Sequence, residues 1–420
     1  MTIEEKICGM KMYKLGDLCS DVVDCPHSTP EWKNEGIRVI RNFNIVNGSL
    51  DFSNGFFVDE ETFEKRTQRA CPEFEDLVIS REAPMGAVCM IPKNLKCCLG
   101  QRLVLLKINK EVADPNYILF TIQSQFVQRQ IQIIDQTGSI VSNLNIPDLK
   151  SLRIPLPSLP EQKKIASVLS ALDDKIALNK KMNQKLEAMA KRLYDYWFVQ
   201  YDFPDKNGHP YKTTGGPMTY NPTLKRDIPE GWKVDVVGNV CETVLGGTPS
   251  TENESFWNGN IPWLNSGEVA EFPILNAEKR ITEDAVKNSA TAYLPAGSVT
   301  LSITRHLRPS IMAIDACINQ SVAGIKENDI LKNGYLYPYL VNEIPRLNTL
   351  RGGAQQPHIN KDTVDKSPIV IPAQNVLHQY YEKVNPLYKE IIEKAKESQK
   401  LTVLRDKLLP LLMNGQVMVR

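Results

Sequence analysis

The sequence of 420 residues contains only five histidines, and they are spread over the whole chain. None of them lies at the close spacing to a cysteine or another histidine that is typical of zinc sites. The nine cysteines are also scattered and include no C-x-x-C pair, a pattern typical of buried, reduced thiols in a cytosolic protein. The sequence therefore indicates neither a metal centre nor a disulfide framework.

Motifs that hold phosphate-bearing cofactors are absent as well. We find no G-x-x-x-x-G-K-[ST] loop and no G-x-G-x-x-G motif after a strand. Asn221-Pro222-Thr223 matches only the start of an amino-methyltransferase signature and is interpreted as a turn. Glu31-Trp32-Lys33 has the E-x-K half of a nuclease motif without an acidic partner upstream, and we interpret it as chance. We therefore expect no catalytic residue, no metal and no cofactor in this chain.

No apolar run approaches the 18 residues of a membrane span, and the sequence MTIEEKICGMKMYK lacks the apolar core of a signal peptide. We expect a cytoplasmic protein without a membrane contact. The net charge of +1 means that any affinity for nucleic acid must come from local clusters. The length leaves room for two or three domains.

A long helix is predicted from Ser158 to Gln200. Ser158 and Glu161 have the spacing of a capping box, and Pro160 lies in the first turn, where proline is tolerated. Apolar residues then recur at alternating steps of four and three, as in a coiled-coil seam. At about 1.5 Å per residue, this rod is about 60 Å long. A coiled-coil or subunit interface is predicted on this helix and on a second helix near the end of the chain. Its residues are Ile165, Leu169, Leu172, Ile176, Asn179, Asn183, Leu186, Leu193, Ile391, Leu401, Leu404 and Leu408.

The second helical pattern spans about residues 376–413, and Pro386 and Pro410 are expected to kink or shorten it. In the first helix, Asn179 and Asn183 interrupt the seam, where an amide pair fixes register at a cost in stability. The alternative, a helix buried in one large domain, fits the solvated lysines less well. We expect the two helices to pair antiparallel, with the domains at opposite ends about a pseudo-twofold axis.

The remaining segments predict an α+β fold. Strands are expected at Leu77–Ser80, Gly86–Ile91, Arg102–Ile108, Ile261–Leu264, Ser298–Ile303 and Ile311–Ile314, and one helix at Tyr117–Ile134. The predicted organisation is a first mixed domain (1–157), a central long helix (158–200), an irregular linker (201–230), a second mixed domain (231–372), a C-terminal long helix (373–413) and a tail (414–420).

The chain repeats itself once. LGDLC at 15–19 matches VGNVC at 237–241, and Cys98-Leu99-Gly100-Gln101 matches Cys317-Ile318-Asn319-Gln320. The loop at 138–145 matches 353–360, an offset of 215 residues. A period this long is too great for a solenoid and indicates a duplication, in which a mixed α/β domain followed by a rod occurs twice.

Both predicted domains carry arginine, amide and hydroxyl side chains in loops at corresponding places. Arginine, asparagine and glutamine form bidentate contacts with base edges in the major groove, and serine and backbone amides hold phosphates. For any one residue, a solvated surface position is the more ordinary interpretation, so the hypothesis depends on the set. The DNA-binding candidates are Arg38, Arg41, Asn42, Asn44, Arg81, Ser139, Trp263, Asn265, Ser266, Arg305, Arg308, Gln355, Gln356 and His358.

Several stretches resemble the specificity subunit of type I restriction–modification systems. They are LPSLPEQKKIASVLSALDDKI at 156–176, DYWFVQYDFPDKNGHPYKTTGGPMTYNPTLKRDIPEGWKV at 195–234, and the domain ends GSIVSNLNIPDLKSLRIPLP and GGAQQPHINKDTVDKSPIVIP. The resemblance covers essentially the whole chain. It departs in the C-terminal helix, where VLHQYYEKVNPLYKEI lacks the L-P-x-x-E-Q start.

The resemblance implies a subunit without its own catalytic site. Each recognition domain would read one half of a bipartite, asymmetric sequence in double-stranded DNA, and the paired helices would set the gap. Two modification (methyltransferase) subunits would dock on this chain, and two restriction (motor-nuclease) subunits would complete the complex. S-adenosylmethionine, ATP and Mg would bind in those partner subunits. Two alternatives remain at this point: a self-contained methyltransferase or nuclease with the same recognition architecture, and a coiled-coil adaptor with no nucleic-acid role.

Overall fold

The computed structural model describes residues 10–46, 48–137, 143–352, 357–417 and 419. The chain divides into two compact units: Met1–Ile176 with Lys400–Arg420, and Ala177–Gln399. Domain 1, the first repeat, lies in the first unit, and domain 2, the second repeat, lies in the second. Within the described ranges, no helix is long and apolar enough to cross a membrane.

Domain 1 is built on two sheets. An antiparallel sheet has the order β2-β10-β7-β8, with β2 Cys19–Asp24, β10 Leu103–Ile108, β7 Leu77–Ser80 and β8 Val88–Met90. The other has the order β6-β3-β9, with β6 Phe57–Val58, β3 Ile37–Ile40 and β9 Cys97–Leu99, and β3 and β9 are parallel. Two small pairs are β1 Met12–Lys14 with β11 Arg153–Pro155, and β4 Ile45–Val46 with β5 Ser49–Leu50.

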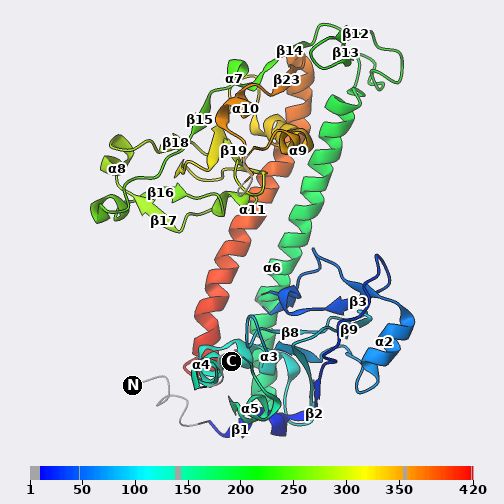
Figure 1. Ribbon diagram of the computed structural model, residues 1–420, viewed down its shortest axis with the longest axis vertical. Helices are drawn as coiled ribbons and strands as arrows, with labels where there is room; N and C mark the ends of the chain where they lie inside the picture. Colours follow the sequence, from blue (N-terminus) through cyan, green and yellow to red (C-terminus); the bar gives the residue numbers. More distant parts are fainter. Residues whose placement is uncertain (1–9, 47, 138–142, 353–356, 418, 420) are drawn as a thin grey trace. The chain divides into compact units, whose positions relative to one another are not determined.

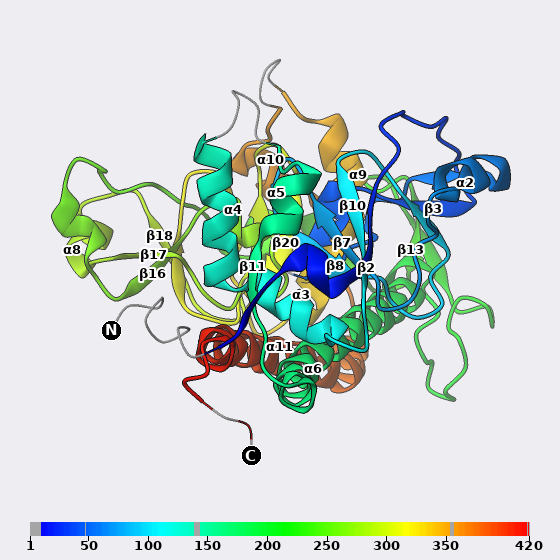
Figure 2. The same ribbon diagram turned by 90° about the horizontal axis from the view of Figure 1, so that it is seen from below.

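The helices of domain 1 are α2 Glu60–Thr67, α3 Pro115–Gln123, α4 Gln125–Thr137 and α5 Ile146–Ser151. The helical pattern predicted over Tyr117–Ile134 is confirmed, but it is divided between two helices, α3 and α4. Ser124 has extended backbone angles, and its carbonyl accepts the amide of Gln128, so it starts a new helix. Helix α3 packs on β8, and α5 packs on the 3-10 helix Leu15–Leu18 (Figure 2).

Domain 2 repeats the arrangement of both sheets, and its second sheet has one further strand. Its antiparallel sheet has the order β15-β22-β19-β20, with β15 Thr243–Leu245, β22 Val322–Ile325, β19 Val299–Ser302 and β20 Arg308–Ile311. Its second sheet has the order β17-β16-β21-β18, with β17 Lys279–Ile281, β16 Ile261–Leu264, β21 Ala316–Ile318 and β18 Ala292–Leu294, and β16 and β21 are parallel. The pair β14 Lys233–Val236 and β23 Pro368–Ile371 corresponds to β1 and β11.

Helices in domain 2 also correspond to those in domain 1. They are α7 Val237–Val240, α8 Glu283–Lys287, α9 Asn333–Thr349 and α10 Lys361–Asp365. Asn145 caps α5 and Asn360 caps α10 in the same way, because each side-chain oxygen accepts the amide three residues on. The predicted duplication is confirmed by these matching sheets and caps.

The strand predicted at Ile311–Ile314 is wrong, because Val299–Ser302 pairs with Arg308–Ile311 in a hairpin. The segment at 201–230 is not wholly irregular. It contains a hairpin of β12 Met218–Asn221 and β13 Arg226–Pro229. Of the cysteines in the described ranges, Cys71 is exposed and Cys19 is partly exposed, while the other six are buried.

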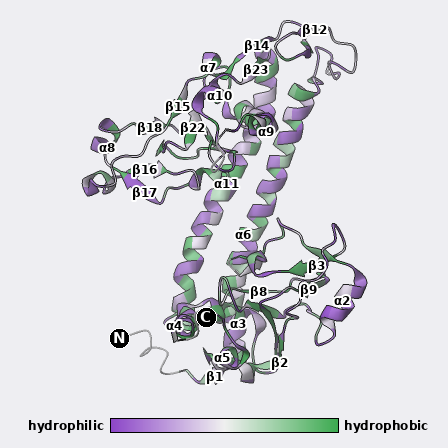
Figure 3. Cartoon of the chain, viewed as in Figure 1, coloured by the Kyte–Doolittle hydropathy of each residue, from purple (hydrophilic) through white to green (hydrophobic). Residues whose placement is uncertain are grey.

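The long helices are α6 Leu159–Tyr194, followed by a π-helical turn at Asp195–Val199, and α11 Gln374–Met413. In each unit a part of α6 lies beside a part of α11 (Figure 1). Figure 3 shows hydrophobic and hydrophilic residues mixed along both helices, as expected for helices with one apolar face. The predicted shortening at Pro386 and Pro410 is wrong, since α11 continues through both prolines. Buried Val384 and Ile391 hold the helix on the core of domain 2 on both sides of Pro386.

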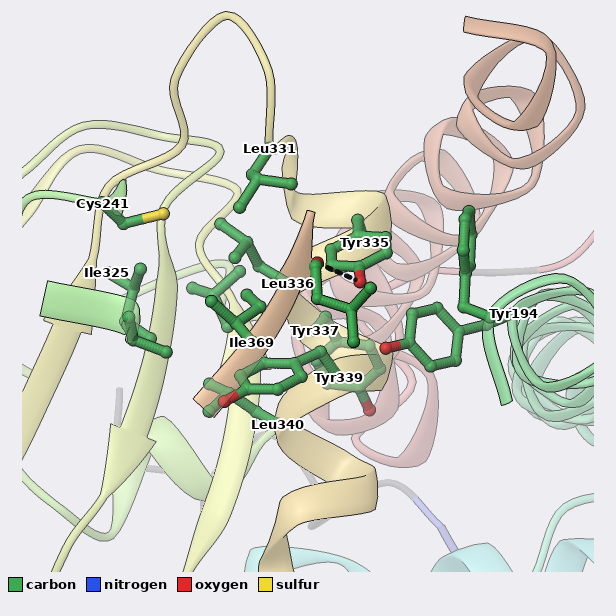
Figure 4. Packing of buried hydrophobic residues seen from close by; sticks show 14 of the residues in the cluster. Tyr194, Cys241, Ile325, Leu331, Tyr335, Leu336, Tyr337, Tyr339, Leu340 and Ile369 are labelled. Atoms are coloured by element: carbon green, nitrogen blue, oxygen red, sulfur yellow. Dashed lines mark hydrogen bonds between the residues drawn. The ribbon is translucent and has the colours of Figure 1, made fainter. Parts of the chain in front are cut away.

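Tyrosines and aliphatic residues fill the core of domain 2 (Figure 4). Tyr335 on α9 is fully buried, and its hydroxyl donates to the carbonyl of Val370 at 2.7 Å. Tyr194 of α6 packs against the same ring, with the ring centroids 5.3 Å apart. The second half of α6 is therefore part of the hydrophobic core of domain 2 and helps to stabilise that domain.

Candidate nucleic-acid interface

Two arginines of domain 1, Arg38 in β3 and Arg41 in the corner that follows it, lie over aromatic rings. The guanidinium carbon of Arg41 lies 4.7, 4.9 and 5.5 Å from the ring centroids of Phe56, Phe43 and Trp32. That of Arg38 lies 4.7 Å from Phe52 and 5.1 Å from Phe57. Neither guanidinium forms an ion pair or hydrogen bond with the described part of the chain. Cation–π contact orients the planar group but leaves its N–H donors free.

Phe43 is 42% exposed, so the ring cluster opens to solvent beside Arg41. Sequence reasoning identified both arginines but missed the rings that hold them. The available signal was the density of aromatic residues around them, with Trp32, Phe43, Phe52, Phe56 and Phe57 falling within a short stretch.

Two asparagines in the same corner have structural roles. Asn44 is buried at 3% exposure, its oxygen accepts the Arg41 amide at 2.9 Å, and its nitrogen donates to the carbonyls of Asp51 and Asn54. The prediction that Asn44 contacts DNA is therefore not supported by its geometry. The Asn42 side chain donates to the carbonyl of Ala83 at 2.7 Å, which joins the corner to the β7–β8 hairpin tip.

Arg81 begins that hairpin tip, but its charge is already neutralised. Its guanidinium contacts both oxygens of Asp24 at 2.9 and 3.0 Å and donates to the carbonyl of Leu144, and the side chain is only 11% exposed. Glu82 next to it is paired with Arg102 at 3.0 Å. This geometry does not favour the predicted DNA contact, because a guanidinium on a side chain that is 11% exposed and already paired with a carboxylate has few donors left for a ligand.

The equivalent tip in domain 2 is different. It connects β19 to β20, and the side chains of Arg305, His306 and Arg308 are exposed. No hydrogen bond or ion pair involves these three side chains within the described ranges. Ile303 and Leu307, by contrast, are 5% and 7% exposed and anchor both sides of the tip in the core.

Residues from a later segment of domain 2 also hold the tip through hydrogen bonds. The Arg351 guanidinium donates to the carbonyls of Arg305 and Pro357, and the Ile359 amide donates to the carbonyl of Ile303 at 3.1 Å. His358, a predicted DNA contact, is exposed and pairs through its backbone with Thr304 and Gly352. Arg305 has a φ of +56°, a conformation that costs energy in a residue other than glycine and is often found at functional sites. Sequence reasoning did not identify Arg351.

Three other candidates lie in β16 and in the corner that follows it. Trp263 is 5% exposed, and its ring nitrogen donates to the carbonyl of Gly247, so it belongs to the core and not to a DNA surface. The Asn265 oxygen accepts the amides of Gly267 and Glu268 and so shapes the turn. Ser266 is partly exposed in that turn. The remaining candidates Ser139, Gln355 and Gln356 lie outside the described residues.

The predicted seam residues divide between the two units. In the first unit, Ile165 and Leu169 pack in one core cluster with Leu412 and Met413 of α11, and Leu408 packs against it. Asp173 of α6 also accepts a hydrogen bond from Arg405 of α11 at 2.9 Å. Leu172, Ile176 and Leu401 are partly exposed there. Leu404 is 44% exposed, so its prediction as an interface residue between the two helices is not supported.

In the second unit, the asparagines bridge the helices. Asn179 is fully buried, and its nitrogen donates to Glu397 at 2.9 Å, while Asn183 donates to the carbonyl of Ile391 at 3.1 Å. Since higher numbers on α6 meet lower numbers on α11, the helices are antiparallel there. Leu186 and Leu193 pack against the core cluster that contains Ile391.

The chemistry of the thiols does not suggest a reactive site. Burial raises the pKa of Cys98 and of Cys317, at the matching places in β9 and β21, to about 11, so both are protonated near neutral pH. Among the described residues, no group of three histidine, cysteine or acidic side chains is placed to hold a metal ion.

Comparisons with known proteins agree with this architecture. The sequence profile of the family described as type I restriction modification DNA specificity domain matches residues 8–188 and again residues 229–402. The chain therefore belongs to this family and carries its domain twice.

Relatives in the family share modest identity with this chain. The MjaIX type I restriction enzyme specificity subunit of Methanocaldococcus jannaschii is 27% identical over 370 residues, which cover 86% of this chain and 82% of that protein. The HindI specificity subunit of Haemophilus influenzae is 21% identical over 373 residues, covering 76% and 81%. The crystal structure of the type I restriction–modification S subunit from M. genitalium has 16% identity, a TM-score of 0.59 and covers 96% of each chain, which shows a shared fold.

Proposed function

We propose that this chain is the sequence-reading subunit of a type I restriction–modification complex and has no catalytic site of its own. Each domain reads one half of a bipartite, asymmetric target in double-stranded DNA, and the paired helices α6 and α11 set the gap between the halves. The observation that carries this proposal is that the specificity domain occurs twice, and that in each copy an anchored loop holds an arginine side chain with no ion pair or hydrogen bond among the described residues.

Unpaired, oriented arginines are suited to this task. A guanidinium offers two parallel N–H donors to the O6 and N7 atoms of guanine in the major groove. The net charge of the chain is only +1, so affinity depends on these local groups and on the partner subunits. Since the arginines differ in position between the domains, the two halves of the target are expected to differ.

The assembly is proposed from the family. Two modification subunits dock on this chain and bring S-adenosylmethionine, and two restriction subunits bring ATP and Mg. The named relatives are specificity subunits, which does not favour a self-contained methyltransferase or nuclease. Tight, stoichiometric binding of S-adenosylmethionine by the isolated chain would favour that alternative.

The direct test is binding by the complex of this chain with its modification subunits. Selection from a pool of randomised duplexes should enrich one sequence with two defined parts separated by a gap of constant length. Enrichment of no sequence would contradict the proposal and favour an adaptor without a nucleic-acid role. A single undivided sequence would contradict the assignment of one half to each domain.

A further inference from the structure

The two domains have the same topology, so their loops can be compared position by position. In domain 1 the Gly100 amide donates to the carbonyl of Ile40, and in domain 2 the Asn319 amide donates to that of Leu264. Arg41 therefore corresponds to Asn265. In each corner, the backbone amide of this residue donates to a side chain three residues later, Asn44 in domain 1 and Glu268 in domain 2.

The hairpin tips correspond in the same way. The Leu144 amide donates to the carbonyl of Arg81, and the Ile359 amide donates to that of Ile303. Arg81 therefore corresponds to the buried Ile303. The tip that starts with Arg81 has its charges paired inside domain 1, whereas the tip after Ile303 exposes Arg305, His306 and Arg308.

The corner and the tip are neighbours in each domain. In domain 1 the Asn42 side chain of the corner donates to Ala83 of the tip. In domain 2 the Ser310 hydroxyl, next to the tip on β20, donates to the carbonyl of Glu271, just after the corner. Both loops therefore belong to one edge of each domain. In both domains this edge carries an arginine side chain that has no partner within the described ranges, but on different loops.

From this reciprocal pattern we propose that the two domains read DNA with non-equivalent loops. Arg41, in the corner after β3, reads a guanine in the half-site of domain 1. Arg305, at the β19–β20 tip, reads a guanine in the half-site of domain 2. Asn265, which corresponds to Arg41, and Arg81, which starts the hairpin tip of domain 1, shape the loops without reading a base. This inference rests on the proposed function and adds to it the residue and the base for each half.

Before DNA binds, the side chain of Arg41 and the backbone of Arg305 are each held in place. Three rings surround the Arg41 guanidinium, which lowers the entropy lost when it binds a base. The Arg305 backbone is fixed by Arg351 and by the buried Ile303 and Leu307. No described acidic side chain pairs with Arg41 or Arg305.

The test uses the complex of this chain with its modification subunits. The DNA target of the complex without substitutions is determined first. Binding is measured against duplexes that each change one base pair. The unmodified complex should lose about 10- to 100-fold in affinity when the guanine read by either arginine is replaced. Arg41→Met fills the space between the rings but lacks the donors, and it should reduce this preference below about threefold in one half only. Arg305→Met should do the same in the other half.

Further variants distinguish base reading from folding and charge. Arg41→Lys and Arg305→Lys keep the charge but not the paired donors, and they should also lose the guanine preference while keeping affinity for unrelated DNA. Arg129→Met on α4 and Lys233→Met on β14 remove exposed charges elsewhere and should keep every preference. Arg81→Met should lower the melting temperature without changing any base preference.

The inference would be overturned if Arg41→Met and Arg305→Met kept the full preference for guanine of the unsubstituted complex. It would also be overturned if one of these variants changed the base preference in both halves of the target. Loss of a base preference in folded Arg81→Met would also overturn it. A different result bears on the proposed function itself: if the unmodified complex prefers no sequence, the chain does not read DNA, whatever its variants do.

Discussion

Replacing Asn179 with leucine should stabilise the second unit. Asn179 is fully buried between α6 and α11, and among the described residues its side-chain oxygen has no hydrogen-bond partner. An unsatisfied buried polar group costs about 1–3 kcal/mol. Leucine removes this cost and adds buried apolar surface. It also loses the bond to Glu397, but that carboxylate is 40% exposed and has Lys394 at 3.6 Å, so water and lysine replace much of it.

The expected net gain is about 2 kcal/mol, or roughly 4–8 °C in melting temperature for a unit of this size. Calorimetry of the full chain gives the transition, and hydrogen exchange of the amides in Ala177–Tyr194 assigns it to the second unit. Asn385→Leu on the exposed face of α11 controls for helix propensity and should change stability by less than about 0.5 kcal/mol. A loss of stability in Asn179→Leu would refute the reasoning, because it would mean that the amide contributes more than its burial costs.

Leu169→Ala should destabilise the first unit by about 2–5 kcal/mol in denaturant unfolding, because Leu169 is fully buried in its core; a change below 1 kcal/mol would contradict that packing. Arg66→Met should cost about 2–4 kcal/mol in the same assay, since its buried guanidinium donates to the carbonyls of Pro26, Ser28 and Leu99, and an unchanged midpoint would be inconsistent with these bonds. Ser158→Ala should lower the unfolding midpoint at pH 7. Hydrogen bonds from the Ser158 hydroxyl and amide lower the pKa of Glu161, so this stability is present above the unfolded pKa of about 4.5 and is lost as the pH falls through the lower folded pKa. If the difference in free energy of unfolding between Ser158→Ala and the unsubstituted protein stayed constant down to pH 2, this explanation would be contradicted.

Much of the fold could be predicted from periodicity and repetition. Strands at Leu77–Ser80 and Ile261–Leu264 are found where their apolar runs indicate, and the duplication follows from matched turns and caps. Glu161 accepts the Ser158 amide, as a capping box requires, although the Ser158 hydroxyl donates to the same carboxylate. Pro386 in α11 shows the limit of local reasoning, because packing against the core of domain 2 outweighs the lost backbone hydrogen bond.

The candidate site was less predictable, because residue type does not reveal the partner of a side chain. Arg81 and Arg305 look alike in the sequence, but Asp24, distant in the chain, neutralises the first. Trp263 was expected at the DNA surface, but it fills the core against Trp257. Such pairings depend on contacts between distant segments, which no spacing rule encodes.

The most direct test of the central claim, that each domain reads its own half of the target, is a map of methylated bases after a domain exchange. Residues 231–372 would be replaced with domain 2 of another family member, and the genome of cells that carry the complex would be mapped. The account predicts that one half of the methylated sequence changes, while the other half and the gap between them stay the same. A change in both halves, or in neither, would contradict it.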